Sequence, residues 1–436
     1  MRKTWNVYLR IALLFLGVII LAEAQASEYD VVERFKELED KFKTHEMLNP
    51  IGHDFVFDVG LLLNKDLFDV IDDVDKVSDT QGSTAAKLSA AQNILRKYDK
   101  TEQNVRLHLN LGFPLPTFHA FGVKIIPDFR THVGVGALLG FRATSLTISQ
   151  ILANIGTYVG SDVPAAVATK LQQSACTAGM TNGTDIVQHL IDTSACGLSA
   201  AEITAITPLV GKYKIPSDTT VPDIFNYAKA EAKVGFNFGY EYGEKWFGTF
   251  NLYGMGRADM KVRVSADSIA AKGEVADLGE ELNTTMYLSA DYRLGYKNGN
   301  LRTWFALEEL KLSELSNNEE KAGALNYGTD PLIRLHGEYM YKLSFFSVKP
   351  FGGVHKRSGY GLGNGIYGGA DLGLHVWQER LGLRFRGMLD SEHFTFSPMA
   401  KLWFMSVEYM LKTPIKSEID GVKPSTLHSV NFRLAF

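Results

Sequence analysis

The sequence has few cysteines, little net charge and a single long apolar run, and each shortage excludes a class of protein. Two cysteines among 436 residues are too few for a disulfide-rich scaffold or a four-cysteine zinc site. A formal net charge of −4 gives no overall basic field for binding nucleic acid. No stretch of 18 apolar residues exists, which excludes a bundle of transmembrane helices.

Aromatic residues and glycines, in contrast, are plentiful. The chain has 26 Phe, 18 Tyr and 40 Gly, and 45% of its residues are hydrophobic. A disordered chain does not carry so much aromatic surface. The composition is typical of many short strands whose two faces meet different surroundings.

The first 26 residues have the layout of a secretory signal peptide. Arg2, Lys3 and Arg10 form a basic start. The apolar run 11–22 follows, and Ala24-Gln25-Ala26 supplies the small residues of a cleavage site. The run is too short for a membrane anchor, which needs roughly 20 residues. We therefore expect residues 1–26 to be removed and the mature chain to begin at Ser27.

Alternation of apolar and polar side chains dominates the mature chain. Transmembrane strands need about 10 residues with this alternation, and lipid accepts strands only in a closed barrel. In 332–343, for example, Ile333 and Leu335 alternate with Arg334 and His336. Polar side chains on such strands must face water, so they are expected to line a lumen. The expected lumen-lining residues are Arg293, Arg334, His336, Glu338, Asp371, His375, Arg384 and Arg386.

These patterns predict an all-β membrane protein, a closed antiparallel β-barrel with helical inserts that occupies residues 51–436. Fifteen strands are expected, at 54–63, 104–113, 118–126, 130–140, 228–242, 246–256, 258–265, 285–296, 301–312, 332–343, 345–356, 366–376, 380–390, 400–411 and 427–436. Bacterial single-chain barrels use even numbers, so we expect about 14 strands, with 12 and 16 open. The long connection 412–426 falls on the opposite side from 266–284, 313–331 and 357–365, which indicates an error after residue 366.

The C-terminus carries the most specific pattern. Val430, Phe432, Leu434 and Phe436 share one face of the last predicted strand, and the chain ends on an aromatic residue. This ending resembles the C-terminal assembly signal of bacterial outer-membrane barrels. The alternative is an ordinary edge strand, which would be an aggregation hazard in a soluble protein.

Three segments have helical periodicity instead. Residues 27–50 contain an amphipathic helix, which either packs on the barrel end or serves as a plug or partner-binding helix. Residues 64–103 predict a helical hairpin with one stripe at Phe68, Ile71, Val74 and Val77. Residues 144–227 form a larger helical insert. In an oxidising envelope Cys176 and Cys196 of this insert are expected to form a disulfide, with two buried free thiols as the alternative.

One stretch of the chain resembles a known family. The segments DLFDVIDDVDKV, LSAAQNILRKY and NVRLHLNLGFPLPTFHAFGVKI, in this order, resemble the conjugal-transfer TraF-like outer-membrane barrels. The resemblance covers mainly residues 54–140 and implies an Asp-rich helical hairpin between early strands. The general size, with material before the first strand, also resembles the FadL-like long-chain fatty acid channels.

The chemistry of an enzyme is not found. The sequence has no G-x-S-x-G, H-E-x-x-H, P-loop or C-x-x-C motif, and no cofactor or metal site is expected. His108, His119, Asp128 and His132 lie near each other in sequence, but chance placement on strands explains them. An outer-membrane hydrolase is therefore the least favoured function.

Two functions remain open. The first is a channel or TraF-like envelope component in the bacterial outer membrane, with a polar lumen partly occluded by helices. The second is a docking component of an envelope or conjugation assembly. The expected partners are outer-membrane lipid, the assembly machinery and envelope proteins that contact the inserts, and not nucleic acid.

Overall fold

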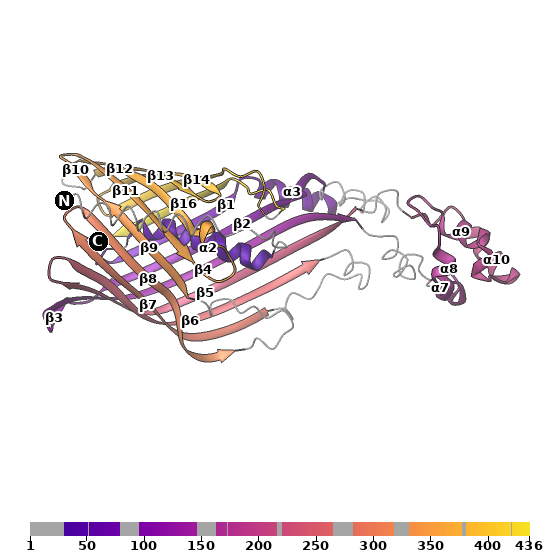
Figure 1. The fold of residues 1–436 in the computed structure, drawn as a ribbon, viewed down its shortest axis with the longest axis horizontal. Coiled ribbons are helices and arrows are strands. Elements are labelled where there is room, and N and C mark those ends of the chain that lie inside the picture. Colours follow the sequence, from indigo (N-terminus) through magenta and orange to yellow (C-terminus); the bar gives the residue numbers. More distant parts are fainter. Residues whose placement is uncertain are drawn as a thin grey trace, which may run out of the picture.

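The strands of this chain pair antiparallel with their neighbours and close into a ring. The computed structural model describes residues 30–50, 52–78, 96–145, 163–171, 173–215, 220–264, 282–317, 331–376, 381–419 and 421–436. The strands that form the wall are β1 (Val56–Asn64), β2 (Thr101–Pro114), β4 (Val123–Ser145), β5 (Thr220–Tyr242), β6 (Trp246–Val264), β7 (Leu282–Asn298), β8 (Leu301–Asn317), β9 (Leu332–Tyr339), β11 (Phe346–Lys356), β12 (Ile366–Val376), β13 (Leu381–Asp390), β14 (His393–Leu402), β15 (Met405–Pro414) and β16 (Leu427–Ala435). They form a closed 14-stranded barrel (Figure 1), which confirms the predicted fold class.

Two further strands are short extensions of the wall. β3 (Phe118–Ala120) pairs only with β4, and β10 (Tyr341–Leu343) pairs only with β11. The ring closes where β16 pairs with β1. The terminal residue takes part in this seam, because Phe55 and Phe436 exchange two backbone hydrogen bonds of 2.8 and 3.0 Å.

The strand count shows where the sequence patterns misled. Predicted strands 118–126 and 130–140 belong largely to one strand, β4, and 246–256 and 258–265 are both parts of β6. β14 was not predicted. Proline explains two of these errors, since Pro127 interrupts the pattern of β4 and Pro398 that of β14, where the ladder to β15 is broken. With β14 in place, the connection 415–426 moves to the same barrel end as the other long connections.

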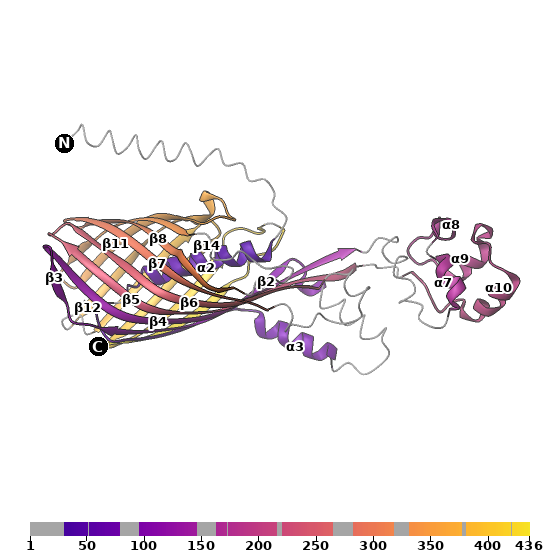
Figure 2. The same ribbon diagram turned by 90° about the horizontal axis from the view of Figure 1, so that it is seen from below.

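The barrel therefore has a short-turn end and a long-loop end. The short-turn end carries the tight connections and the C-terminus (Figure 2). The long-loop end carries α3 (Leu67–Ser78), the connection from β4 to β5, and η4 (Leu362–Gly365). Among the described residues, no helix is long and apolar enough to cross a membrane.

The two faces of the wall differ sharply in exposure. In β9 the side chain of Ile333 is 43% exposed and that of its neighbour Arg334 is 0% exposed. A belt of exposed apolar side chains surrounds the barrel. At the short-turn end the belt includes a row of aromatic rings, each in contact with the next: Phe404, Phe436, Phe55, Phe113 and Phe129. Aromatic girdles of this kind mark membrane interfaces of β-barrels.

β4 and β5 run far beyond the rim and end at a separate helical domain (Figures 1 and 2). Each strand has 23 residues, whereas about 10 cross a bilayer. The expected helical insert 144–227 is therefore shorter, because β5 already begins at Thr220. The domain contains α7 (Ala165–Leu171), α8 (Ser174–Thr177), α9 (Ile186–Asp192), η2 (Ser194–Cys196), α10 (Ala200–Ile206) and η3 (Thr207–Leu209).

The predicted disulfide of this domain is not formed in the structure. Cys176 and Cys196 are free thiols, buried with aliphatic side chains in one core. Burial raises the pKa of the Cys196 thiol to about 12, and a hydrogen bond with Cys176 adds to the rise. Free cysteine packs as a small hydrophobic residue, so the core holds the helices together without a covalent link.

Other predictions lie partly or wholly outside the described residues. These are the signal peptide 1–26 and most of the second helix of the hairpin 64–103. The first helix of that hairpin is α3, but its exposed and buried sides differ from the prediction. Phe68 is exposed, and Val70 packs against Tyr98 and Phe141.

Candidate functional site: the occupied lumen

The barrel lumen contains a helix from the same chain. α2 (Val31–Met47) begins at Asp30, whose carboxylate accepts hydrogen bonds from the backbone N–H groups of Val32 and Glu33 at 2.7 and 3.3 Å. Figure 2 shows α2 inside the wall, with the helix running along the barrel. Of the two placements that the sequence left open, the structure has the plug and not a helix on the barrel end.

An apolar stripe on α2 packs on an apolar patch of the inner wall. Val31, Phe35 and Leu38 are buried, and the ring of Phe35 lies edge-on to Tyr227 of β5 with centroids 4.9 Å apart. The wall side of this cluster is formed by Leu62, Leu138, Phe225, Tyr227, Met410 and Leu427. Without α2, this patch would face the water of the lumen, so burial of apolar area favours the plugged state.

The remaining faces of α2 are charged, and the wall supplies partners for several of these charges. Arg34 contacts two carboxylates, Glu102 of β2 at 2.8 Å and Glu392, in the turn between β13 and β14, at 2.8 Å. Lys41, two turns further along, reaches the same Glu392 at 2.8 Å. Arg34 and Lys41 therefore share Glu392, and Arg34 also holds Glu102 on the other side of the β16–β1 seam.

A second group of contacts joins α2 to the other side of the barrel. Asp40 is fully buried and pairs with both nitrogens of the Arg357 fork, with Nε–Oδ2 and Nη2–Oδ1 distances of 3.0 Å. The Tyr360 hydroxyl donates to the same carboxylate at 3.0 Å, and Arg357 also pairs with Glu309 of β8 at 2.9 Å. Lys43 contacts Glu309 at 2.7 Å.

Arginines of the wall also hold the C-terminal end of α2. Arg386 of β13 donates to the carbonyl of Leu48 at 3.0 Å and to the carbonyl of His45 at 3.3 Å, while Asp371 holds its guanidinium at 2.7 Å. Arg334 of β9 donates to the Thr44 hydroxyl. A cation at a helix C-terminus satisfies free carbonyls and opposes the negative end of the helix dipole.

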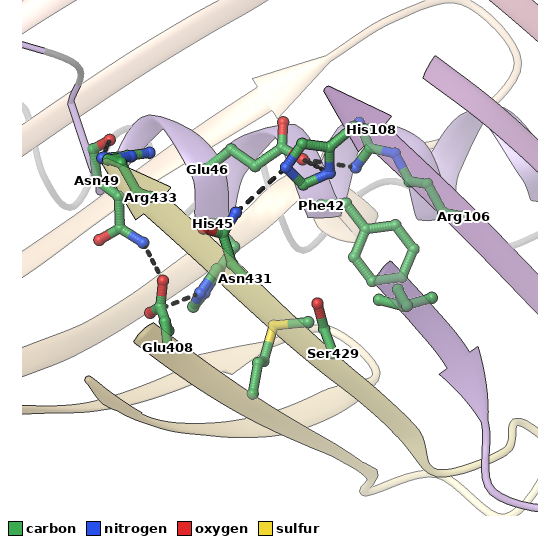
Figure 3. Close-up of a pocket in the computed structure, with 12 residues that line it drawn as sticks. Phe42, His45, Glu46, Asn49, Arg106, His108, Glu408, Ser429, Asn431 and Arg433 are labelled. Carbon is green, nitrogen blue, oxygen red and sulfur yellow. Dashed lines mark hydrogen bonds and ion pairs between the residues drawn. The ribbon is translucent and has the colours of Figure 1, made fainter. Parts of the chain in front are cut away.

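A small cavity of about 40 Å³ lies between this end of α2 and the seam strands (Figure 3). His45 contacts Glu408 of β15 at 3.1 Å, and Glu46 contacts Arg106 and His108 of β2 at 3.0 and 3.3 Å. The cavity is large enough for a few water molecules and far too small for a substrate.

The structure places the predicted lumen residues on this inner face. The partners of these residues are Trp304 for Arg293, Glu308 and Thr44 for Arg334, Tyr367 for His336, Lys349 for Glu338, Arg386 for Asp371, and Glu408 for Arg384. For His375 the structure describes only the backbone, which pairs with Gly382. Four of the eight, Arg334, Asp371, Arg384 and Arg386, contact α2 or a wall residue that α2 contacts.

Sequence analysis missed several other residues that bind α2. Glu102, Glu392 and Arg357 lie at strand ends or in connections, where alternation gives no signal. Glu309 has a left-handed backbone with φ of 62° at an irregular position of β8, which shifts it out of the predicted alternation. Only the amphipathic pattern of residues 28–48 could have indicated that charged partners were needed.

No arrangement for catalysis is found among the described residues. His119 lies exposed at the short-turn tip, Asp128 pairs with Arg130, and His132 contacts Asn110 at 2.6 Å. The described residues contain no group of three or more His, Cys, Asp or Glu side chains that could hold a metal ion. The chemistry of the lumen is that of ion pairing between a helix and a wall.

Comparison with known proteins adds little to these findings. No family model and no curated protein matches the sequence. A mutant of the Rh. blastica porin is similar to 88% of this chain and 99% of its own, with 9% identity and a TM-score of 0.27. CdiB from Acinetobacter baumannii matches 88% of this chain and 60% of its own at 6% identity and a TM-score of 0.32. Outer membrane phospholipase A from Escherichia coli matches 87% and 90% at 11% identity and a TM-score of 0.24. The architecture therefore rests on the strand pairing itself.

Proposed function

We propose that the protein is an outer-membrane channel that its own N-terminal helix holds closed. The observation that carries this proposal is the content of the lumen. A charged helix lies inside a polar wall and forms ion pairs and hydrogen bonds with strands and connections on several sides of the barrel. The exposed apolar belt and the aromatic girdle support a place in the bacterial outer membrane.

The charged contacts between α2 and the wall favour a helix that can leave the lumen, rather than one that is a permanent part of the barrel core. A buried ion pair contributes little net stability, because each charge loses its hydration on burial and regains it when water returns. Arg34, Lys41 and Asp40 can therefore exchange wall partners for water without a large net loss. The apolar stripe around Phe35 then supplies most of the free energy that keeps the lumen closed.

The helical domain on the β4–β5 hairpin supports a second role, docking of an envelope or conjugation component. The domain has a hydrophobic core of its own and stands beyond the rim, where a channel wall has no use for it. The resemblance of residues 54–140 to TraF-like barrels supports the same role. The two roles are compatible in one molecule.

Conductance of purified protein in planar bilayers tests the channel. Deleting residues 30–48 should produce steady open channels, whereas the wild type should stay closed for most of the recording. Deleting residues 146–219 instead is the matched control, because it removes the outer domain and leaves α2 and its contacts intact.

A second variant separates a removable helix from a fixed one. Cysteines at Thr44 and Arg334, in a background without Cys176 and Cys196, allow a short bifunctional thiol reagent to tie α2 to β9. Tied and untied protein should differ in the frequency of openings. If the 30–48 deletion yields folded barrels that conduct no ions, the channel proposal is wrong and docking remains.

A further inference from the structure

A concavity with three basic side chains lies at the short-turn end of the barrel. It has a volume of about 610 Å³ and is lined by residues of the β5–β6 turn, the β7–β8 turn and the strand ends beside them. The two turns are neighbours, because Trp246 pairs with Tyr296 in the β6–β7 ladder. In an outer-membrane barrel the short turns face the periplasm, so the concavity is open to solutes on that side.

Two of the three basic side chains are held opposite each other. Lys297 of β7 and Arg302 of β8 are direct partners in the ladder, and alternation puts both on the lumen face, in line with Arg293 and Trp304. Like charges directly opposite each other destabilise a sheet. Lys245 of the β5–β6 turn is the third, and its carbonyl accepts a hydrogen bond from the Lys297 backbone at 2.7 Å. We call Lys245, Lys297 and Arg302 the mouth cations.

The neighbouring carboxylates have other partners. Glu241 lines the same concavity and contacts Lys124 at 3.0 Å. Glu338 lies opposite Arg302 in the β8–β9 ladder but contacts Lys349 at 3.3 Å. Within the part of the chain that the structure describes, no ion pair or hydrogen bond joins a side chain of the mouth cations to another residue. Their charge is therefore not neutralised by the wall, in contrast to that of Arg334, Arg357 and Arg386 in the lumen.

An aromatic ring lies beside the mouth cations. Phe247 of β6 lines the concavity and lies directly opposite Gly295 of β7. A Cβ atom added to Gly295 would overlap the ring, so Phe247 rests on the β7 backbone because no side chain is in its way. Glu244 also lines the concavity, but the mouth cations outnumber it. The surface thus combines an excess of positive charge with an apolar ring.

We infer that this concavity binds a small organic anion. Its carboxylate or phosphate group contacts the mouth cations, and its apolar part lies on Phe247. The occupant is a soluble anion and not a lipid head group, because Lys297 and Arg302 face the lumen, whereas the 45% exposed Trp246 faces the lipid. The inference deepens the proposed function, on which it rests for its meaning, since it assigns organic anions as the solutes that reach the channel. The binding itself requires no conduction.

Binding of benzoate to the purified full-length protein in non-ionic detergent tests the site, with saturation-transfer NMR at low ionic strength as the measurement. Benzoate carries a carboxylate on a flat apolar ring, and benzyl alcohol is the neutral probe of similar shape. We expect saturable binding of benzoate and none of benzyl alcohol. Inorganic phosphate should displace benzoate, and added salt should weaken the binding because it screens exposed charges.

Substitutions locate the bound probe. Lys297→Gln and Arg302→Gln should each raise the dissociation constants of benzoate and phosphate roughly threefold, as is typical of one exposed charge contact. Lys401→Gln is the matched control, because Lys401 is also an exposed lysine at the short-turn end, but lies on β14 outside the concavity. Phe247→Ala should weaken the binding of benzoate and leave that of phosphate unchanged. Heat-modified mobility on gels verifies that each variant is a folded barrel.

Three results would overturn the inference. The first is no saturable binding of benzoate to the folded wild type. The second is an equal loss in Lys401→Gln, which would show that the charge of the whole mouth acts and not a site. The third is equal affinity for benzoate and phosphate that Phe247→Ala does not change, which would exclude an organic ligand. None of these depends on current, so a barrel that fails to conduct after deletion of 30–48 would refute the channel and leave the site standing.

Discussion

The buried pair between Asp40 and Arg357 gives the sharpest test of how α2 is held. Asp40→Asn keeps the size of the side chain and removes its charge. The change replaces one of the two acceptor oxygens by an NH2 group that faces the donors Arg357 and Tyr360, and the remaining amide oxygen is a weaker, uncharged acceptor. Removing one partner of a buried ion pair costs about 3–5 kcal/mol. Arg357 keeps Glu309 at 2.9 Å, so the lower figure of about 3 kcal/mol applies.

This loss acts on the closed state alone, because Asp40 and Arg357 regain water once α2 leaves. A difference of about 3 kcal/mol multiplies the ratio of open to closed barrels by roughly 150. Hydrogen exchange of the α2 amides should accelerate by this factor, and the open fraction in bilayer recordings should rise with it. Because helix and wall are separate segments, the barrel strands should keep their slow exchange.

Asp128→Asn is the matched control for this substitution. Asp128 is also buried and also pairs with an arginine, Arg130, but both residues belong to β4 and neither contacts α2. The control should leave exchange of α2 unchanged. Equal acceleration in both variants, or none in Asp40→Asn with a folded barrel, would refute the view that Asp40 and Arg357 form a buried pair that is present only while α2 occupies the lumen.

Three further outcomes are expected. Deleting Phe436 should lower the amount of assembled barrel, because the residue closes the β16–β1 seam with two backbone hydrogen bonds and stacks on Phe55; heat-modified mobility on gels measures this, and wild-type levels would contradict it. A cysteine at Arg334 should react with a water-soluble thiol reagent only after residues 30–48 are deleted, and one at Ile333 in neither protein; labelling of both positions alike would show that the two faces of β9 are not distinct. In the outer domain, hydrogen bonds from the Ser199 backbone and Lys170 lower the pKa of Glu202 to about 2. Its contribution to the cap of α10 is therefore complete above about pH 4.5 and is lost as the pH falls toward 2, so exchange of the α10 amides should accelerate there in the wild type and not in Glu202→Gln.

The barrel was predictable because alternation is a local property of the chain. Each wall strand must present apolar side chains to one side and polar ones to the other. Segments such as 332–343 therefore show a two-residue period of apolar and polar residues that can be seen in the sequence. The errors have local causes too. Proline hides β14 and divides β4, since it breaks the pattern of a strand without ending the strand.

The position of α2 in the lumen, in contrast, could not be predicted from a local pattern. The amphipathic pattern of residues 28–48 shows that one stripe needs apolar contacts, but it fits the barrel end and the lumen equally well. Only the closed wall brings Glu102, Glu392 and Arg357 within 3.0 Å of one helix, although these residues lie far apart in the sequence. Ion pairing depends on distances that no local period records.

The sequence by itself thus determined most of the strands, the faces of the wall and the helical character of the inserts, because these follow from periodicity within single segments. The tertiary structure decided the strand number, the occupant of the lumen and the state of Cys176 and Cys196. It also decided that the apolar stripe of α2 packs on β4 and β5, the two strands that continue beyond the rim. The strand number and the occupant of the lumen depend on distant segments that meet only when β16 closes on β1, whereas the state of the two thiols depends on how the helices of the outer domain pack.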